Sequence, residues 1–451
     1  MVKRAIPAIV AGSLGLGSLA NAAEEGRPSP QELTEQINAL KAQVERLQAN
    51  QDAQADRLSA QEVDATVDTI LRDADRRSQL LQVQGFTAGY SKGKFLIQDE
   101  AGDFVLNPNL QLQVRYVYNN REEDAEDSIA GDAANESGFE LRRTKFSFDG
   151  SLYKKLKYQF QWATSRSGGG VSLEAANVSY KFADAWSVKL GQYKDPTFHE
   201  EITSSKRQLA VDRSLANEAL AGGITDYIQG IALQWAEEGM AVRGELGYSD
   251  GPNSDNTNFV DGGGSAAFGV ANPNYGAYGR LEYLAFGDWK QYDDFTAMKN
   301  TQDLLVLGAG GFYTEAGDST ALFHTLDAQY ELGDRLGLYA AYYGVFGEPG
   351  DGDETYDVGG VAQAGYMLTD KLEAFGRYAL VKFDDTEDDE DEFQEFTAGV
   401  NYYFAGHATK LTVDAVWLPD GAPTNDTGIG HLDPDADEEQ FLVRGQFQIL
   451  L

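Results

Sequence analysis

Basic and amide residues alternate one for one with bulky apolar residues in LRRTKFSFDGSLYKKLKYQFQWATS, residues 141–165. Successive side chains of a β-strand point to opposite faces, so each strand here would have one polar and one apolar face. The polar set is Arg143, Lys145, Lys155, Lys157, Gln159 and Gln161, and the apolar set is Phe146, Phe148, Leu156, Tyr158, Phe160 and Trp162. A row of cations along a water-filled surface attracts small anions.

The same two-residue period predicts more basic side chains on the polar faces of neighbouring strands. The candidate anion-binding residues on strands are Arg115, Arg143, Lys145, Lys155, Lys157, Lys181 and Lys189, with Lys194 at the end of its strand. Lys206, Arg207 and Arg213 would join them if the loop DPTFHEEITSSKRQLAVDRSLANEALAGG folds inward, and Glu200 and Glu201 would oppose them.

Two alternatives remain open at this point. The basic residues could instead pair with carboxylates on distant strands, such as Glu245, Glu282, Asp327 or Glu373. The loop could instead lie outside and pack against a neighbouring subunit.

Sixteen runs alternate in this way, or nearly so, and most are nine to thirteen residues long. A tilted transmembrane strand needs about nine to eleven residues, whereas strands of soluble proteins have about five or six. The runs are 104–118, 138–149, 154–166, 171–183, 186–194, 224–235, 239–249, 275–286, 303–314, 320–332, 335–347, 355–368, 371–383, 393–404, 408–418 and 440–451.

These runs predict an all-β fold, a 16-stranded antiparallel transmembrane β-barrel. A strand inside a bilayer can pair every backbone group only in a closed sheet. A lysine facing lipid at mid-depth would cost about 2–4 kcal/mol, so the apolar face must point outward. A barrel of this strand number is too wide for side chains to fill, and an aqueous channel remains.

The connections alternate in length, as in outer-membrane barrels with short inner turns and long outer loops. Turns such as AD, TD and AGH follow even-numbered runs, and long polar segments such as REEDAEDSIAGDAANE follow odd-numbered runs. Two connections break the rule: GDWKQYDDFTAMKNTQ is long for an inner turn, and TEAGDS is short for an outer loop.

The N-terminal residues predict two further segments. Residues 1–22 have a basic start with Lys3 and Arg4, an apolar stretch and small residues at 20–22, the pattern of a secretory signal peptide. Residues 23–84 are expected to form a periplasmic α-helical coiled-coil stalk, because apolar residues recur at heptad spacing. The seam residues are Leu33, Ile37, Leu40, Val44, Leu47 and Leu58. The alternative is a disordered polar tail. The barrel would occupy 85–451.

Composition and motifs narrow the function. The chain has 72 acidic and 36 basic residues, so we expect no nucleic-acid partner. It has no cysteine, its four histidines lack metal-ligand spacing, and no catalytic motif is present, so we expect no catalytic residue, no metal and no enzyme activity. Calcium at the acidic segments 351–357 and 433–439 is the alternative, but solvated loop carboxylates are the simpler interpretation.

Several segments resemble the phosphate-selective porin (porin O and P) family. They are GFTAGYSKGKFLIQDEAGDFVLNPNLQLQVRY, FELRRTKFSFDGSL, VKLGQYKDPTF and ITSSKRQLAVDRSLANEAL. The resemblance implies a trimeric sixteen-stranded channel in the outer membrane of a Gram-negative-type bacterium. Lipid and lipopolysaccharide would surround it, and small anions would pass a constriction lined with Arg and Lys. The inward bases that match this region are Arg115, Arg143, Lys145, Lys189 and Lys194.

Two functions follow as hypotheses. The first is a porin for passive diffusion of small solutes, biased toward anions, with phosphate or other inorganic anions as candidates. The second is an envelope tether, in which the barrel anchors a periplasmic coiled coil that contacts the cell wall.

Overall fold

The N-terminal part of the chain forms a unit of its own, Met1–Leu81, separate from Gln82–Leu451. The computed structural model describes residues 31, 34–35, 37–50, 69, 72, 85–91, 94–121, 135–166, 168–252, 273–350, 352–384, 391–423 and 439–451. Residues 37–50 are helical, and Ile37, Leu40, Val44 and Leu47 are exposed on this helix. The expected signal peptide and most of the expected stalk lie outside the described residues, so the coiled coil stays a prediction. Within the described part, no helix is both long and apolar enough to span a bilayer.

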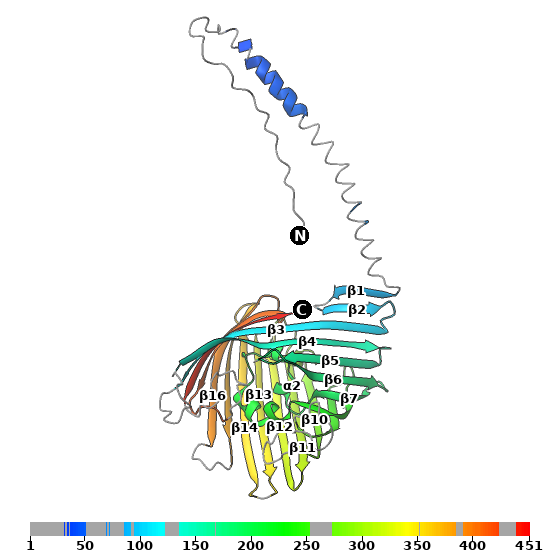
Figure 1. Ribbon diagram of the computed structural model, residues 1–451, viewed down its shortest axis with the longest axis vertical. Helices are drawn as coiled ribbons and strands as arrows, with labels where there is room; N and C mark the ends of the chain where they lie inside the picture. The colour runs from blue at the N-terminus through cyan, green and yellow to red at the C-terminus, as the bar shows by residue number, and fades with distance from the viewer. Residues whose placement is uncertain are drawn as a thin grey trace. The chain divides into compact units, whose positions relative to one another are not determined.

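The alternating runs of the second unit form sixteen consecutive antiparallel strands, β3 to β18 (Figure 1). Their bounds are β3 Phe104–Arg121, β4 Asn135–Leu152, β5 Leu156–Thr164, β6 Val171–Lys181, β7 Trp186–Lys194, β8 Tyr227–Trp235, β9 Val242–Ser249, β10 Tyr275–Phe286, β11 Leu304–Ala316, β12 Ser319–Leu332, β13 Leu336–Glu348, β14 Thr355–Met367, β15 Leu372–Lys382, β16 Glu392–Tyr403, β17 Thr409–Leu418 and β18 Gln440–Leu450. Each predicted run corresponds to one of these strands.

The sheet closes on itself between its last and first strands. β18 pairs with β3 from Gln440↔Arg121 to Leu450↔Gln111. The predicted closed 16-stranded antiparallel β-barrel is therefore confirmed. We call the end where β3 begins and β18 ends the inner end, following the orientation expected from the sequence, and the opposite end the outer end.

A short hairpin precedes the barrel and was not predicted. It consists of β1 (Phe86–Ser91) and β2 (Lys94–Asp99), and β2 joins the start of β3 through Ile97↔Leu106 and Gln98↔Val105. Its six-residue strands are shorter than a bilayer crossing and shorter than any of the sixteen alternating runs.

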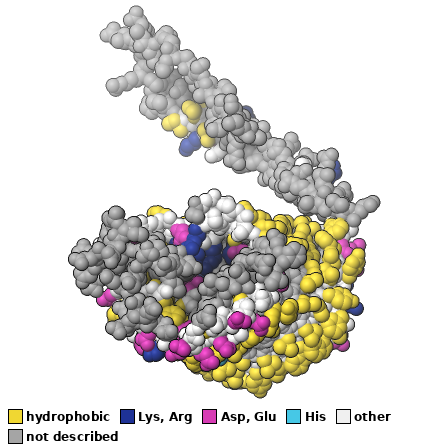
Figure 2. Space-filling view, turned by 60° about the horizontal axis from the view of Figure 1, so that its bottom comes forward, with side chains coloured by type: hydrophobic (Ala, Val, Ile, Leu, Met, Phe, Trp, Pro, Cys, Tyr) yellow, Lys and Arg dark blue, Asp and Glu magenta, His cyan; other side chains and the backbone are white. Residues whose placement is uncertain are grey.

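The two faces of the barrel wall differ in polarity as expected. Hydrophobic side chains cover the outer surface of the wall in Figure 2. On this surface Phe146 stacks on Trp162, with ring centroids 5.1 Å apart and an angle of 13° between the rings. The polar side chains of the same strands point into the lumen, where water can solvate them.

The two connections that broke the length rule have a physical explanation. At the outer end, β11 and β12 are joined by Gly317 and Asp318 alone, and Gly317 adopts φ 61°, as a tight hairpin requires. At the inner end, residues 287–303 contain the 3₁₀ turn η2 (Gln291–Asp293) and fold into the barrel, where Tyr292 and Phe295 are buried. This long turn therefore packs inside the barrel wall.

The connection between β7 and β8, residues 195–226, also folds into the barrel; we call it the lumen loop (Figure 1). It contains α2 (His199–Ile202), η1 (Ser205–Arg207), α3 (Leu215–Leu220) and α4 (Gly222–Thr225). Its residues Leu209, Leu215 and Leu220 form an apolar core with inward side chains that include Tyr343, Val361 and Phe375 of β13, β14 and β15. Because this core fills one side of the lumen, the open path follows the β3–β9 side.

Candidate functional site

Two cavities lie along the β3–β9 side of the lumen. The middle cavity has a volume of about 420 Å³, and the inner cavity has a volume of about 680 Å³. Both are lined by Gln159, Asn177 and Lys189, so they are neighbouring parts of one path. Lys and Arg side chains are visible inside the opening of the barrel in Figure 2.

Nine of the eleven candidate residues line these cavities. Arg143, Lys145, Lys189, Lys194, Lys206 and Arg213 line the middle cavity, together with the acidic residues Glu201 and Glu245. Lys154, Lys155, Lys157, Lys181, Lys189 and Arg243 line the inner cavity, together with Asp149, Glu237 and Glu238. Basic side chains outnumber acidic ones in both linings.

The other two candidates, Arg115 and Arg207, line neither cavity. Arg115 is 1% exposed and lies between Glu140 and Asp212. Arg207 forms an ion pair with Asp293 of the inner turn, 3.2 Å from Nη1 to Oδ2. Arg115 is thus enclosed in the protein, and Arg207 connects the lumen loop to the inner turn.

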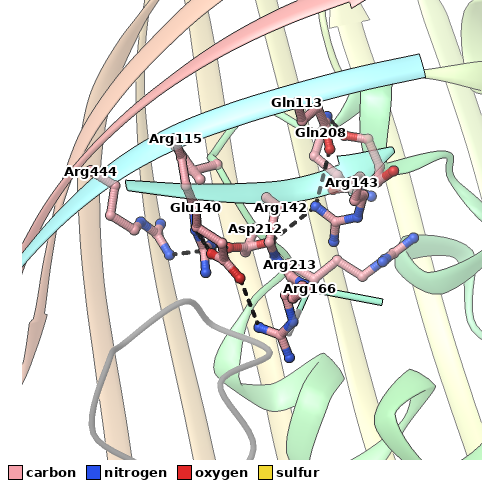
Figure 3. A network of polar contacts seen from close by, with 12 residues as sticks. Gln113, Arg115, Glu140, Arg142, Arg143, Arg166, Gln208, Asp212, Arg213 and Arg444 are labelled. Carbon is pink, nitrogen blue, oxygen red and sulfur yellow. Dashed lines mark hydrogen bonds and ion pairs between the residues drawn. The ribbon is translucent and has the colours of Figure 1, made fainter. Parts of the chain in front are cut away.

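Asp212 of the lumen loop is the centre of an arginine cluster (Figure 3). Its carboxylate lies 2.9 Å from Arg142 Nε, 3.2 Å from Arg143 Nη1 and 3.9 Å from Arg444 Nη1, and it also pairs with Arg115. Burial alone would raise the pKa of Asp212, but Arg142, Arg115, Arg143 and Arg444 outweigh it and hold the pKa well below its usual range. The cluster attaches the loop to β3, β4 and β18.

Most bases of the middle cavity also have carboxylate partners. Lys145 pairs with Glu174 at 2.7 Å, and Lys189 pairs with Glu245 at 2.6 Å. Lys194 pairs with both Glu201 and Asp226 of the lumen loop. Of the four acids considered from the sequence as partners, Glu245 does pair with a candidate base. Glu282 and Asp327 pair with Arg280 instead, and Glu373 accepts hydrogen bonds from Thr296, Asn401 and Tyr403.

The lysines of the inner cavity differ in this respect. Among the described residues, Lys155, Lys157 and Lys181 have no ion-pair partner. Lys155, directly before β5, and Lys181, the last residue of β6, are neighbours, since the Lys181 N–H donates to the Lys155 carbonyl at 2.8 Å. Neighbouring like charges repel, so this arrangement costs free energy and attracts anions from the solvent.

Two charged residues of the site, Arg142 and Glu174, were missed because the strict alternation places both on the lipid face. A β-bulge lies between Gln113 and Val114, opposite Arg143 and Leu141, and leaves Arg142 outside the regular pairing. A second bulge in β6 has the same effect on Glu174, opposite Gln161 and Trp162. Bulges re-aim side chains. The signal in the sequence that could have revealed the bulges was a charged residue at a position expected to face lipid.

Cofactor and metal sites were not expected. Within the described residues, no group of three His, Asp or Glu side chains could hold a metal ion. Most of the acidic segment 433–439 lies outside the described residues, so calcium binding there stays untested. His199 is enclosed, stacking on Tyr292 with ring centroids 3.7 Å apart.

A closed sixteen-stranded barrel with an apolar outer wall and a charged lumen defines an outer-membrane channel. More specifically, the chain belongs to the phosphate-selective porin O and P family, whose match covers residues 109–436. The resemblance seen in the sequence is thereby confirmed. Both the family and the fold are those of channels.

One curated relative and several solved structures are similar to this chain. It is 26% identical over 265 residues to an uncharacterized protein of Aquifex aeolicus (strain VF5), covering 54% of this chain and 62% of that protein. The match therefore spans less than two thirds of the relative's length.

The solved structures share the fold. The anion-selective porin from Comamonas acidovorans has a TM-score of 0.55 and 16% identity, covering 77% of this chain and 99% of the porin. OmpF of Salmonella typhi has a TM-score of 0.51 and 15% identity, covering 80% of this chain and 100% of OmpF. The outer membrane channel DcaP of Acinetobacter baumannii has a TM-score of 0.50 and 12% identity, covering 81% of this chain and 100% of DcaP.

Proposed function

We propose that this outer-membrane channel passes small solutes by passive diffusion and favours anions over cations. The observation that carries the proposal is the excess of basic over acidic side chains along both cavities. A low-dielectric wall focuses the field of such charges into the water-filled path, which raises the local concentration of anions and lowers their barrier.

The unpaired lysines contribute most to this field. The carboxylates of the middle cavity neutralise much of the charge there, whereas Lys155, Lys157 and Lys181 keep theirs. The anion preference should therefore arise mainly at the inner cavity and be moderate in size. Inorganic phosphate is one candidate permeant, because the family carries that name.

Planar bilayers test the proposal directly. The purified full-length protein should give stepwise conductance. Under a KCl gradient, the reversal potential should lie closer to the equilibrium potential of chloride than to that of potassium. A potassium preference would refute the anion bias but leave the channel, whereas absence of conductance would refute both.

We also propose a homotrimer, in line with the family resemblance. Conductance steps grouped in threes, together with a trimer mass in native detergent particles, would support it. Single independent steps from a monomeric particle would refute it.

A further inference from the structure

Glu174 of β6 is surrounded by three different hydrogen-bond donors. Lys145 Nζ lies 2.7 Å from each of its two carboxylate oxygens. Gln161 Nε2 donates to Oε2 at 2.7 Å, and the Tyr227 hydroxyl donates to the same oxygen at 3.3 Å. One ammonium, one amide and one phenol thus converge on one carboxylate.

Glu245 of β9 has the same three kinds of donor. Lys189 Nζ lies 2.6 Å from Oε1, and the Tyr278 hydroxyl donates to that oxygen at 3.0 Å. Gln234 Nε2 donates to Oε2 at 2.8 Å. These residues come from β7, β8, β9 and β10, whereas those around Glu174 come from β4, β5, β6 and β8, so the arrangement occurs twice in the wall.

The amide of the second set is held in its donating orientation. The hydroxyls of Ser179 and Ser187 donate to Gln234 Oε1 at 3.0 and 3.2 Å, which turns Nε2 toward Glu245. An amide fixed in this way donates to whatever acceptor occupies the position of the carboxylate.

Both sets border water and are not buried core. The side chains of Lys145 and Glu174 are 17% and 18% exposed, and those of Lys189 and Glu245 are 13% and 12% exposed. Both lysines line the middle cavity, through which a permeant ion must pass.

We propose that these two sets are binding sites for small oxyanions, and that Glu174 and Glu245 occupy them as ligands supplied by the protein itself. The inference rests on the proposed anion channel. A permeating oxyanion, a carboxylate or inorganic phosphate, exchanges with the side-chain carboxylate at each site. Charge-assisted hydrogen bonds are strong, and conduction requires that an ion leave as easily as it enters. The two glutamates therefore determine specificity, because they keep the channel from retaining oxyanions.

The test is inhibition of chloride current by inorganic phosphate in planar bilayers, with full-length protein. Glu174→Gln and Glu245→Gln remove the competing charge at constant size, and Glu174→Ala also vacates the space. In each variant, the phosphate concentration that halves the chloride current should fall about tenfold, the effect of making one charge-assisted hydrogen bond available. The matched control is Glu348→Gln, at the outer end of β13, which should match wild type.

A second variant separates the role of charge from disturbed folding. Lys145→Gln combined with Glu174→Gln removes both charges of the first site and should show no gain in phosphate inhibition. An unchanged half-inhibition concentration in the single Gln and Ala variants, or an equal gain in the double variant, would overturn the inference. Those results would leave the anion channel standing, whereas a potassium preference of the wild type would refute the proposed function itself.

Discussion

Asp212 of the lumen loop accepts a hydrogen bond from Arg142 of β4, 2.9 Å from Nε to Oδ1, although the two residues are 70 positions apart in the chain. The contact joins the loop that restricts the lumen to the wall of the barrel. Asp212 is fully buried, so the arginines around it compensate its charge in place of water.

Asp212→Asn should destabilise the protein strongly. The substitution leaves buried guanidinium groups without their shared counter-charge, which costs about 3–5 kcal/mol. Urea unfolding in detergent, followed by circular dichroism, measures the change. The control is Asp334→Asn, which removes an exposed pair with Arg335 and should cost less than about 1 kcal/mol. Equal losses in the two variants would contradict a structural role for the cluster.

Reversing the unpaired lysines of the inner cavity should weaken the anion preference. Lys157→Glu combined with Lys181→Glu should lower the chloride-to-potassium permeability ratio at least about threefold at 0.1 M KCl, with a smaller effect at 1 M, where the Debye length falls from about 10 Å to about 3 Å. Reversal potentials at the two salt concentrations measure this. Lys382→Glu, outside both cavities, is the control. A permeability ratio that does not respond to the double variant would place the selectivity elsewhere.

A methyl group on the inner face of β11 should displace the lumen loop. The Cβ of an alanine at Gly310 would lie 2.4 Å from the Thr197 carbonyl oxygen, so the loop backbone must move. Gly310→Ala should cost about 1–3 kcal/mol and alter the single-channel conductance. At the adjacent Gly311, which faces outward, the nearest atom to a new Cβ is 3.6 Å away, so Gly311→Ala should be tolerated. Equal effects would argue against close packing of the loop.

Acid should destabilise the lumen loop through His199. Burial lowers the pKa of His199 to about 4; Asp327 raises this pKa and Arg280 lowers it further, and both effects are smaller than that of burial. The unfolded chain binds the proton at about pH 6.5, so the free energy of unfolding falls as pH drops from about 6.5 to about 4, by about 3 kcal/mol in total. Urea unfolding at pH 7.5 and 4.5 should show this loss in wild type and a smaller loss in His199→Phe, which binds no proton. The same pH dependence in both would exclude His199 as its source.

The sequence predicted the strands well because lipid on one face and water on the other force a period of two. The closed barrel and the sixteen runs followed from this rule alone. The exact partner of each lumen base did not follow from this rule. Glu245 was named as a possible partner, but its pairing with Lys189 depends on the register between strands, which spacing along the sequence does not contain.

Local irregularities account for the other misses. Arg142 and Glu174 enter the lumen only because a bulge shifts the alternation by one residue. Residues 287–303 looked like an overlong turn, and only the apolar lumen explains why Tyr292 and Phe295 are buried there. In each case, a side chain whose polarity did not suit its expected position was the sign in the sequence that the local structure departs from the regular pattern.

The apolar core between the lumen loop and β13–β15 has a consequence for biogenesis. The loop follows β7, yet the surfaces that shield Leu209, Leu215 and Leu220 are synthesised much later in the chain. A partly assembled barrel ending before β13 would present these leucines to solvent inside an open half-shell. We therefore expect closure of the last seam and burial of these leucines to be coupled, and a barrel that lacks its final strands to be prone to aggregation.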